Sequence, residues 1–431
     1  MKPVSYSRVT SVLAIVRHDA GRIWRAGVLH VGVSNFFTRF TSLAQRILLA
    51  RILGAENIGH IAIVTAILSL IRLPAGVGTF TVVNKLVAEN ANDARAQKEV
   101  IGTSIYINLV TSLLIGVVSW LVLSRTAWVN DPIANRLLRI LVIFLPLMIF
   151  SEVFRNALMG RRRMQTVAKL DVLLSLVSIL VVIPMAYAWS LNGWFANQIL
   201  VILLGCGLLA WNVRDILSLK WNVAIGKKVA VIGSFAFLGQ LVGTLILQFD
   251  TLSVGNILGP AEAGIYNTAA LVAQQMLVVP GAILTAVFPV VAQNRNNPQG
   301  LKQRYWELFR KIGVLMLGLS LFMWLICPWF FNLFGRDFGP SVGPFRILLL
   351  GTIARSLYVL DNTYLDALGR TDITFASGLF AALCTILLNL TFIPVWGISG
   401  AAWATTLSIF LSLALRQLAV YYFIFHKHAV R

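Results

Sequence analysis

The sequence predicts an all-α membrane protein of about twelve transmembrane helices, arranged as two six-helix lobes related by an internal repeat. The first observation is composition: of 431 residues, 58% are apolar and 12% are charged, whereas a typical soluble chain has about 45–50% apolar and about 25% charged residues. The mean hydropathy is +0.81. The second observation is a series of apolar runs of membrane-spanning length, and the third is a motif that recurs in the two halves of the chain.

Each of the predicted spans is an apolar run long enough to cross a bilayer, which takes about 20 helical residues. We expect the spans at 28–50, 58–82, 100–123, 137–159, 170–190, 195–213, 229–254, 262–292, 309–331, 342–367, 372–394 and 398–425. The connections between them are short, so no sizeable soluble domain is predicted. The expected organisation is a cytoplasmic N-terminal segment (1–27), an N-lobe with spans 1–6 (28–213), a cytoplasmic linker (214–228), a C-lobe with spans 7–12 (229–425) and a cytoplasmic tail (426–431).

The net charge of +20 would suggest a nucleic-acid partner in a soluble protein. Here the lysines and arginines lie in short loops, and the great majority fall on the side of the N-terminus when the loops are numbered along the predicted spans. Positive charge resists translocation, so this bias predicts that both termini are cytoplasmic and that no nucleic acid is bound. The segment up to Arg25 holds no apolar run, and we therefore expect no signal peptide.

The repeat is carried by a short glycine motif at the start of each half. Leu53–Gly59 reads LGAENIG after the first span, and Leu258–Gly264 reads LGPAEAG after the seventh. Two more matches follow at a similar spacing of about 205–210 residues: Ala157–Arg161 with Ala367–Arg370, and Pro184 with Pro394. Six spans per half is an even number, so the halves are parallel repeats, the construction typical of secondary transporters with a substrate path between the halves.

Arginines within the first two spans are the leading candidates for binding residues. A charge in the hydrocarbon costs at least about 2.5–3.5 kcal/mol, so Arg39, Arg46 and Arg72 should face water or a partner. No acid lies near them in sequence. Because guanidinium groups grip phosphate through two donors, we expect these three arginines to bind a diphosphate in a cavity. The alternative is structural: Arg39 and Arg46 would snorkel to lipid head groups.

Polar stripes on other spans predict the remaining cavity lining. Spans 1, 2, 7 and 10 each carry polar side chains at helical steps of three and four, which place them on one face. The candidate lining residues on these spans are Asn35, Gln240, Gln248, Arg355 and Asn362, and Asn267 of span 8 is a further candidate. Asp250 and Asp366 are candidates for coupling to an ion. The structural alternatives are ion pairs, of Glu152 with Arg155, and of Asp361 and Asp366 with Arg355 or Arg370.

At these residues the chain resembles a known family. The stretch Ala50–Gly54, Pro74 and Lys85–Glu89, followed in the second half by Asp250–Pro260, Gly264–Tyr266 and Phe288–Pro289, is similar to the signature of Wzx-type polysaccharide and O-antigen flippases. These belong to the multidrug/oligosaccharidyl-lipid/polysaccharide exporter superfamily. The resemblance covers nearly the whole chain. It implies a V-shaped, MATE-like transporter with a cationic cavity, alternating access and an undecaprenyl-diphosphate-linked oligosaccharide as cargo, and it places Asp250 at the family's acidic position in span 7.

The leading functional hypothesis is therefore a flippase for the repeat units of O-antigen or exopolysaccharide in the inner membrane. The second hypothesis is a cation-coupled multidrug exporter of the same fold, although the first helices carry Arg where drug exporters carry acids. A membrane glycosyltransferase or polymerase is the third, and the sequence offers no nucleophile–base constellation for it. We expect no enzyme activity, no cofactor and no metal site, since the three cysteines lie far apart. The expected partners are membrane lipids, the lipid-linked cargo, and a polymerase and chain-length proteins of the same pathway.

Overall fold

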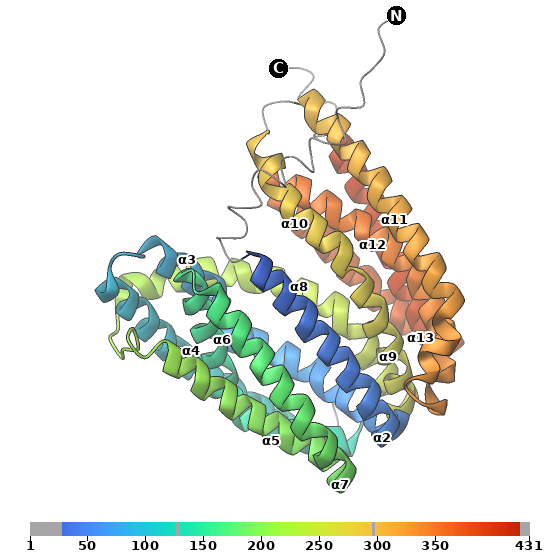
Figure 1. Cartoon of the computed structure of the whole chain (residues 1–431), viewed down its shortest axis with the longest axis horizontal. Helices are drawn as coiled ribbons and strands as arrows, with labels where there is room; N and C mark the ends of the chain where they lie inside the picture. The colour runs from blue at the N-terminus through green and yellow to red at the C-terminus, as the bar shows by residue number, and fades with distance from the viewer. Residues whose placement is uncertain (1–27, 126–129, 295–297, 423–431) are drawn as a thin grey trace, which may run out of the picture. The chain divides into compact units, whose positions relative to one another are not determined.

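The fold of the chain is entirely helical in the part that the computed structural model describes, residues 28–125, 130–294 and 298–422. The predicted cytoplasmic ends, 1–27 and 426–431, lie outside these ranges. The elements in chain order are α2 (Val28–Gly76), α3 (Thr79–Glu89), α4 (Ala94–Arg125), α5 (Pro132–Ile143), α6 (Leu145–Gly160), α7 (Met164–Asn212), α8 (Val223–Leu258), α9 (Pro260–Met276), α10 (Val278–Gln293), α11 (Pro298–Asn332), the 3₁₀ helix η1 (Arg336–Ser341), α12 (Val342–Ala367) and α13 (Thr371–Val420) (Figure 1).

Eight helices of this described part are long and apolar enough to cross a membrane, or nine if α5 and α6, which meet at a bend of 58°, form one span. Three of the longest, α2, α7 and α13, have 49, 49 and 50 residues. At 1.5 Å per residue a straight helix of that length would measure about 75 Å, more than twice the hydrocarbon thickness of about 30 Å. Each is broken by a residue with non-helical backbone angles: Gly54, Ser190 and Gly397. The breaks at Gly54 and Gly397 fall between predicted spans 1 and 2 and between spans 11 and 12, and Ser190 is the last residue of predicted span 5. The total of twelve stays a prediction.

Some breaks lie inside predicted spans. The predicted span 58–82 is interrupted where α2 ends at Gly76, because Val77 and Gly78 both have positive φ. The predicted span 262–292 is divided at Leu277 into α9 and α10. In another place the helix is longer than the predicted span: α8 begins at Val223, within the predicted linker 214–228.

The repeat predicted from the sequence is visible in the backbone. Residues with positive φ recur at equivalent places in the two halves: Gly54 with Gly259, and Ser190 with Gly397. Just after the last pair, a Cβ atom at Gly193 would overlap the carbonyl of Met185, and one at Gly400 would overlap the carbonyl of Phe392. The third helical hairpin of each half (predicted spans 5–6 and 11–12) therefore turns in the same way.

By contacts the chain divides into two compact units. Unit 1 holds the described residues up to Arg46, Thr79–Thr111 and Phe144–Gly233; unit 2 holds Ile47–Gly78, Ser112–Ile143 and the described residues from Ser234 onward. Both units take residues from the predicted N-lobe (28–213), so the lobe boundaries stay a prediction.

Unit 1 packs α6 against α3 and α7. Gly160 lies so close to α3 that a Cβ there would meet the carbonyl of Asn84 at 2.7 Å. The segment before α8 is also docked: a Cβ at Gly102 of α4 would meet the backbone of Lys220 at 2.5 Å. Asn222 caps α8 through the amide of Ala224, and it also donates to Glu99 of α4. The part of the predicted linker that precedes α8, residues 218–222, is thus an ordered segment packed on α4, which we call the strap.

In unit 2, α12 packs against both α11 and α13 (Figure 1). The two glycine motifs meet here in a nearly symmetric crossing. A Cβ at Gly59 would overlap the carbonyl of Pro260, and one at Gly264 would overlap the carbonyl of Ala55. Since Ala55 corresponds to Pro260 and Gly59 to Gly264 in the repeat, each half supplies the same glycine and the same carbonyl. Close backbone approach requires glycine at both positions.

A buried histidine–aspartate pair lies in the same part of unit 2. His60 of α2 bonds Asp131 through Nδ1 and Oδ2, and the two side chains are 4% and 5% exposed. The other oxygen of Asp131 accepts the amides of Ile133 and Ala134 at the start of α5. Although burial raises the pKa of Asp131, the hydrogen bonds from His60 and from these amides lower it below its ordinary value. In the second repeat, Ser341, which precedes α12, donates to the carbonyl of Ile265.

Large apolar side chains cover much of the outer surface. Val110, Leu180, Phe235 and Val314 are each more than 60% exposed. An aqueous surface would not tolerate so many exposed apolar groups, whereas lipid tails would. Together with the span-length helices, this surface identifies a multi-pass membrane protein.

Candidate functional site

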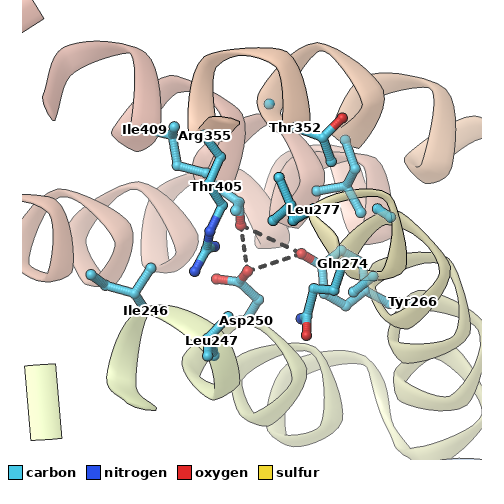
Figure 2. A pocket seen from close by; sticks show the side chains of 14 residues that line it. Ile246, Leu247, Asp250, Tyr266, Gln274, Leu277, Thr352, Arg355, Thr405 and Ile409 are labelled. Carbon is cyan, nitrogen blue, oxygen red and sulfur yellow. Dashed lines mark hydrogen bonds between the residues drawn. The ribbon is translucent and has the colours of Figure 1, made fainter. Parts of the chain in front are cut away.

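Asp250 lies at the centre of a buried polar cluster in unit 2. It is carried by α8 and is 5% exposed. Its Oδ1 accepts a hydrogen bond from Asn389 Nδ2 at 2.7 Å. Its Oδ2 accepts the hydroxyl of Tyr266 at 3.0 Å and that of Thr405 (Figure 2). These donors come from α9 and from both parts of α13, on either side of the Gly397 break. Three neutral donors therefore hold a carboxylate within an apolar helix.

A pocket opens beside Asp250. Its walls are mainly apolar, including Ile246, Leu277 and Ile409, and its polar side chains include Gln274, Thr352 and Arg355. The Arg355 guanidinium points toward the Asp250 carboxylate (Figure 2). Nevertheless, Arg355 makes no hydrogen bond or ion pair with any residue in the described ranges. Such a mostly apolar pocket with a few convergent polar groups is the usual form of a ligand site.

A second polar cluster joins α11, α12 and α13. The buried carboxylate of Asp361 accepts Tyr305 Oη at 2.7 Å and Gln417 Nε2 at 2.9 Å. Next to it, Arg416 is 1% exposed, donates to Ser377 Oγ and lies 3.5 Å above the ring of Tyr358. These bonds fasten three helices together, and we assign this cluster a structural role.

The predicted diphosphate-binding arginines all lie on α2. Arg39 is exposed and Arg46 is partly buried, and both belong to unit 1. Arg72 is partly buried and belongs to unit 2. The side chain of Asn35 lies outside the described side chains. The grouping of these residues around one cargo thus stays a prediction.

The other predicted lining residues belong to unit 2. Gln240 and Gln248 are partly buried on α8, and Asn267 of α9 donates to Thr251 Oγ1 at 3.3 Å. Asn362 Oδ1 is buried without a hydrogen-bond partner among the described residues. Asp366 accepts the hydroxyl of Thr374 at 2.9 Å. The structure therefore brings only Arg355 and Asp250, of the predicted site residues, into the described pocket.

The suggested ion pairs form differently from the sequence-based interpretation. Arg155 of α6 pairs with Asp171 of α7, whereas Glu152, one turn away on its own helix, was the expected partner. Arg370 pairs with Asp372 through both Nε and Nη2, and this exposed pairing raises the pKa of Arg370. Asp361 binds Tyr305 and Gln417 where Arg355 or Arg370 was the expected partner.

Three residues of the Asp250 cluster were not predicted as site residues. Tyr266 was noted only as part of a motif, and Asn389 and Thr405 were not singled out. Each is a polar side chain within an apolar run of predicted span 8, 11 or 12. That polar side chain in an apolar span is the sequence feature that could have identified them. In the described ranges there is no group of three or more His, Cys, Asp or Glu residues that could hold a metal ion.

Comparison with known proteins identifies the family. Residues 48–343 match the model of a family described as polysaccharide biosynthesis protein. The chain belongs to this family. Of its relatives, the putative O-antigen transporter of Shigella flexneri is 24% identical over 86% of this chain and 91% of its own length.

Solved structures show the fold of this polysaccharide biosynthesis protein. An inward-facing multidrug resistance MATE family transporter superposes with a TM-score of 0.77 and 17% identity, covering 90% of this chain and 94% of that one. The lipid II flippase MurJ in an inward closed conformation superposes with a TM-score of 0.74 and 13% identity, covering 90% and 87%. The predicted MATE-like fold is thereby confirmed.

Proposed function

We propose that this protein is a flippase that moves an undecaprenyl-diphosphate-linked oligosaccharide repeat unit from the cytoplasmic to the periplasmic leaflet by alternating access. The observation that carries the proposal is membership of the polysaccharide biosynthesis family combined with a MATE-like fold. The near full-length similarity to an O-antigen transporter adds support. The pathway we assign is O-antigen or exopolysaccharide biosynthesis.

In this proposal the arginines of α2 bind the anionic head of the cargo. Arg39, Arg46 and Arg72 supply guanidinium groups, which stay charged and bind phosphate through parallel donors. The polar side chains of α8, α9 and α12, among them Gln248 and Asn267, contact sugar hydroxyls. The polyprenyl chain stays in lipid, so only the head group crosses the low-dielectric barrier.

We propose Asp250 as the ion-coupling residue, with Asp366 as the other candidate. Asp250 is supported by its surroundings: a hydrogen-bonded carboxylate, the hydroxyl of Thr405, and the Oδ1 atom of Asn389, which is buried and accepts no hydrogen bond within the described part of the chain. Oxygen ligands of this kind suit a hard cation. Of the two ions considered, a proton and sodium, this orphan oxygen favours sodium.

The proposed location is the inner membrane with both termini in the cytoplasm. The positive-charge bias of the loops supports this orientation. A polymerase and chain-length proteins of the same pathway are the proposed protein partners, because the flipped repeat unit must be polymerised on the far side of the membrane.

Complementation of polymer export tests the proposal. In a strain deleted for this gene, the intact gene should restore surface polymer, and Arg39→Ala and Arg72→Ala should fail at normal membrane levels. Arg336→Ala is the matched control, because Arg336 is an exposed arginine of η1 outside the proposed site. Full export by both Arg39→Ala and Arg72→Ala would refute the diphosphate site. Unchanged polymer in the deletion strain, with no intermediate accumulating, would refute the flippase function itself.

The alternative function is a cation-coupled multidrug exporter. It is favoured by the structural similarity to a multidrug resistance MATE transporter and by the acidic residue in the Asp250 pocket. Drug-efflux assays on the same strains distinguish the two: a loss of drug resistance with normal polymer would favour the exporter, and a loss of polymer with normal resistance the flippase.

A further inference from the structure

Arg355 and Asp250 are the opposite charges of the pocket in unit 2. Among the pocket-lining residues in the described ranges, no other Asp, Glu, Lys or Arg is present. They come from different helices, α12 and α8, and the guanidinium points toward the carboxylate (Figure 2). Within the described part of the chain, however, no ion pair joins the two groups.

The hydrogen-bond capacities of the two groups explain this separation. A carboxylate offers about four acceptor positions and a guanidinium five donors. Asp250 already accepts three hydrogen bonds, from Asn389, Tyr266 and Thr405. Arg355 donates none to the described residues. The positive group therefore keeps its full donor set while it faces the buried negative charge.

Arg355 is partly buried and lines the pocket, and a guanidinium in such a place is stabilised by an anionic partner. The field of Asp250 supplies part of that stabilisation. A sodium ion bound at Asp250 would neutralise the carboxylate and remove this contribution. A second anion would then stabilise Arg355 in place of the carboxylate, and the planar guanidinium fork suits an oxyanion that accepts two parallel hydrogen bonds.

We infer that Arg355 is an exchangeable counter-ion: it faces Asp250 when no cation is bound there, and it binds an oxyanion of the cargo in the pocket when sodium occupies Asp250. Gln274 and Thr352 line the same pocket and offer neutral polar groups beside that oxyanion. The oxyanion is a carboxylate of an acidic sugar or a phosphate of the carrier linkage, which share this chemistry. The inference rests on the proposed flippase function and adds the residue that links the coupling ion to the cargo.

Thermodynamic linkage gives the inference a quantitative test. If sodium frees Arg355 for the anion, sodium must tighten anion binding, and the anion must tighten sodium binding by the same factor. Coupling factors between two sites in one protein are typically about 5–150-fold. We expect at least a 5-fold effect here, because both ligands act on groups that face each other directly.

The experiment measures binding to the purified full-length protein in lipid nanodiscs. Isothermal titration uses two probes, glucuronate and inorganic diphosphate, each with and without sodium at constant ionic strength and pH. The expected result is that one probe binds, with a dissociation constant at least about 5-fold lower in sodium. The probe that shows the effect identifies the anion as carboxylate or phosphate. No sodium dependence for either probe would overturn the inference.

Variants at the two residues assign the effect. Asp250→Asn should bind the anion independently of sodium, because Arg355 no longer faces a charge. Arg355→Gln should lose anion binding and keep sodium binding. Arg355→Lys, which keeps the charge but not the fork, should keep the sodium effect with weaker anion binding, and it serves as the second test if Arg355→Gln does not fold. Arg336→Gln is the exposed matched control and should behave as the unaltered protein.

The outcomes separate this inference from the proposed function. Sodium-dependent anion binding that persists in Arg355→Gln would overturn the exchange role of Arg355 even if polymer export still requires the protein. Conversely, polymer export that does not require the gene would refute the flippase function without altering the measured linkage between sodium, Asp250 and Arg355.

Discussion

The two oxygens of Asp131 make two separate contacts, which a pair of substitutions can resolve. Oδ1 accepts the amides of Ile133 and Ala134, at 3.0 and 3.1 Å, and so caps α5. Oδ2 pairs with His60 of α2. Asp131→Asn keeps a capping oxygen and removes the charge, whereas Asp131→Ala removes both contacts.

The magnitudes follow from this division. A buried hydrogen bond to a charged group contributes about 1.5–3 kcal/mol, and we expect Asp131→Asn to lose that amount. Asn caps helices about as well as Asp, whereas Ala at an N-cap costs about a further 1 kcal/mol. Asp131→Ala should therefore be the more destabilised variant. His60→Ala should cost at least as much as Asp131→Asn, because it leaves a buried carboxylate without its partner.

The contribution of Asp131 should also depend on pH. The folded-state pKa of Asp131 lies below its ordinary value, which is about 3.9 in the unfolded chain. The stabilisation is therefore complete above about pH 4 and is lost as the pH falls through the folded-state pKa. Asp131→Asn should remove this part of the acid sensitivity.

Thermal unfolding in detergent and hydrogen exchange at the first turn of α5 measure these effects. Only Asp131→Ala should speed exchange of the capped amides strongly. The matched control is Asp93→Asn, since Asp93 caps α4 through Arg95 and Ala96 in an exposed position, and its charge should matter little. Equal losses in Asp131→Asn and Asp131→Ala would refute the division between the two oxygens.

Three more predictions concern other contacts. Gly264→Leu should destabilise the protein by about 1–3 kcal/mol, because the larger side chain overpacks the helix crossing. Gly281→Leu is the control and should not destabilise it, since the Cβ position of Gly281 faces open space. Equal shifts of the unfolding temperature in the two variants would contradict the crossing. Asn222→Ala removes the cap of α8 and should cost about 1 kcal/mol, measured as faster hydrogen exchange in the first turn of α8; unchanged exchange would contradict the cap. Burial raises the pKa of Asp215, but Arg161 holds it below its ordinary value. Arg161→Gln should therefore raise the pKa of Asp215, which NMR titration of the side chain measures. An unchanged pKa would show that the two side chains do not interact in solution.

The elements that the sequence predicted well are those set by local composition. Apolar runs have a length fixed by the bilayer, so most helices were located correctly. The glycine motifs were also informative, because a glycine that recurs in two halves marks a backbone constraint that no larger residue meets. Gly54 and Gly259 have positive φ, and Gly59 and Gly264 permit the close crossing.

Breaks within the spans were not predictable in this way. Val77 has positive φ, although a β-branched residue gives no local signal for such a turn. Leu277 divides α9 from α10 without a glycine at the break itself. Tertiary packing decides where these helices bend, and the sequence of one segment does not contain that information.

The candidate site was only partly predictable for the same reason. The charge of Asp250 in an apolar span identified it, but its partners Asn389 and Thr405 lie 139 and 155 residues away in sequence. Neighbour rules within one helix proposed Glu152 for Arg155, whereas the helix packing presents Asp171. Contacts between residues far apart in sequence depend on which helices pack together. A single sequence predicts the helices but not which of them are neighbours.

The strap that precedes α8 limits how this chain can be engineered. The backbone of Ser218 and Lys220 packs directly on Gly102. A reporter domain inserted there would therefore disrupt the packing between α4 and the start of α8. The exposed turn residues Ala91 and Asn92, between α3 and α4, offer a safer point for fusion. A join that looks like a flexible connector by composition is thus a poor place to cut or lengthen the polypeptide.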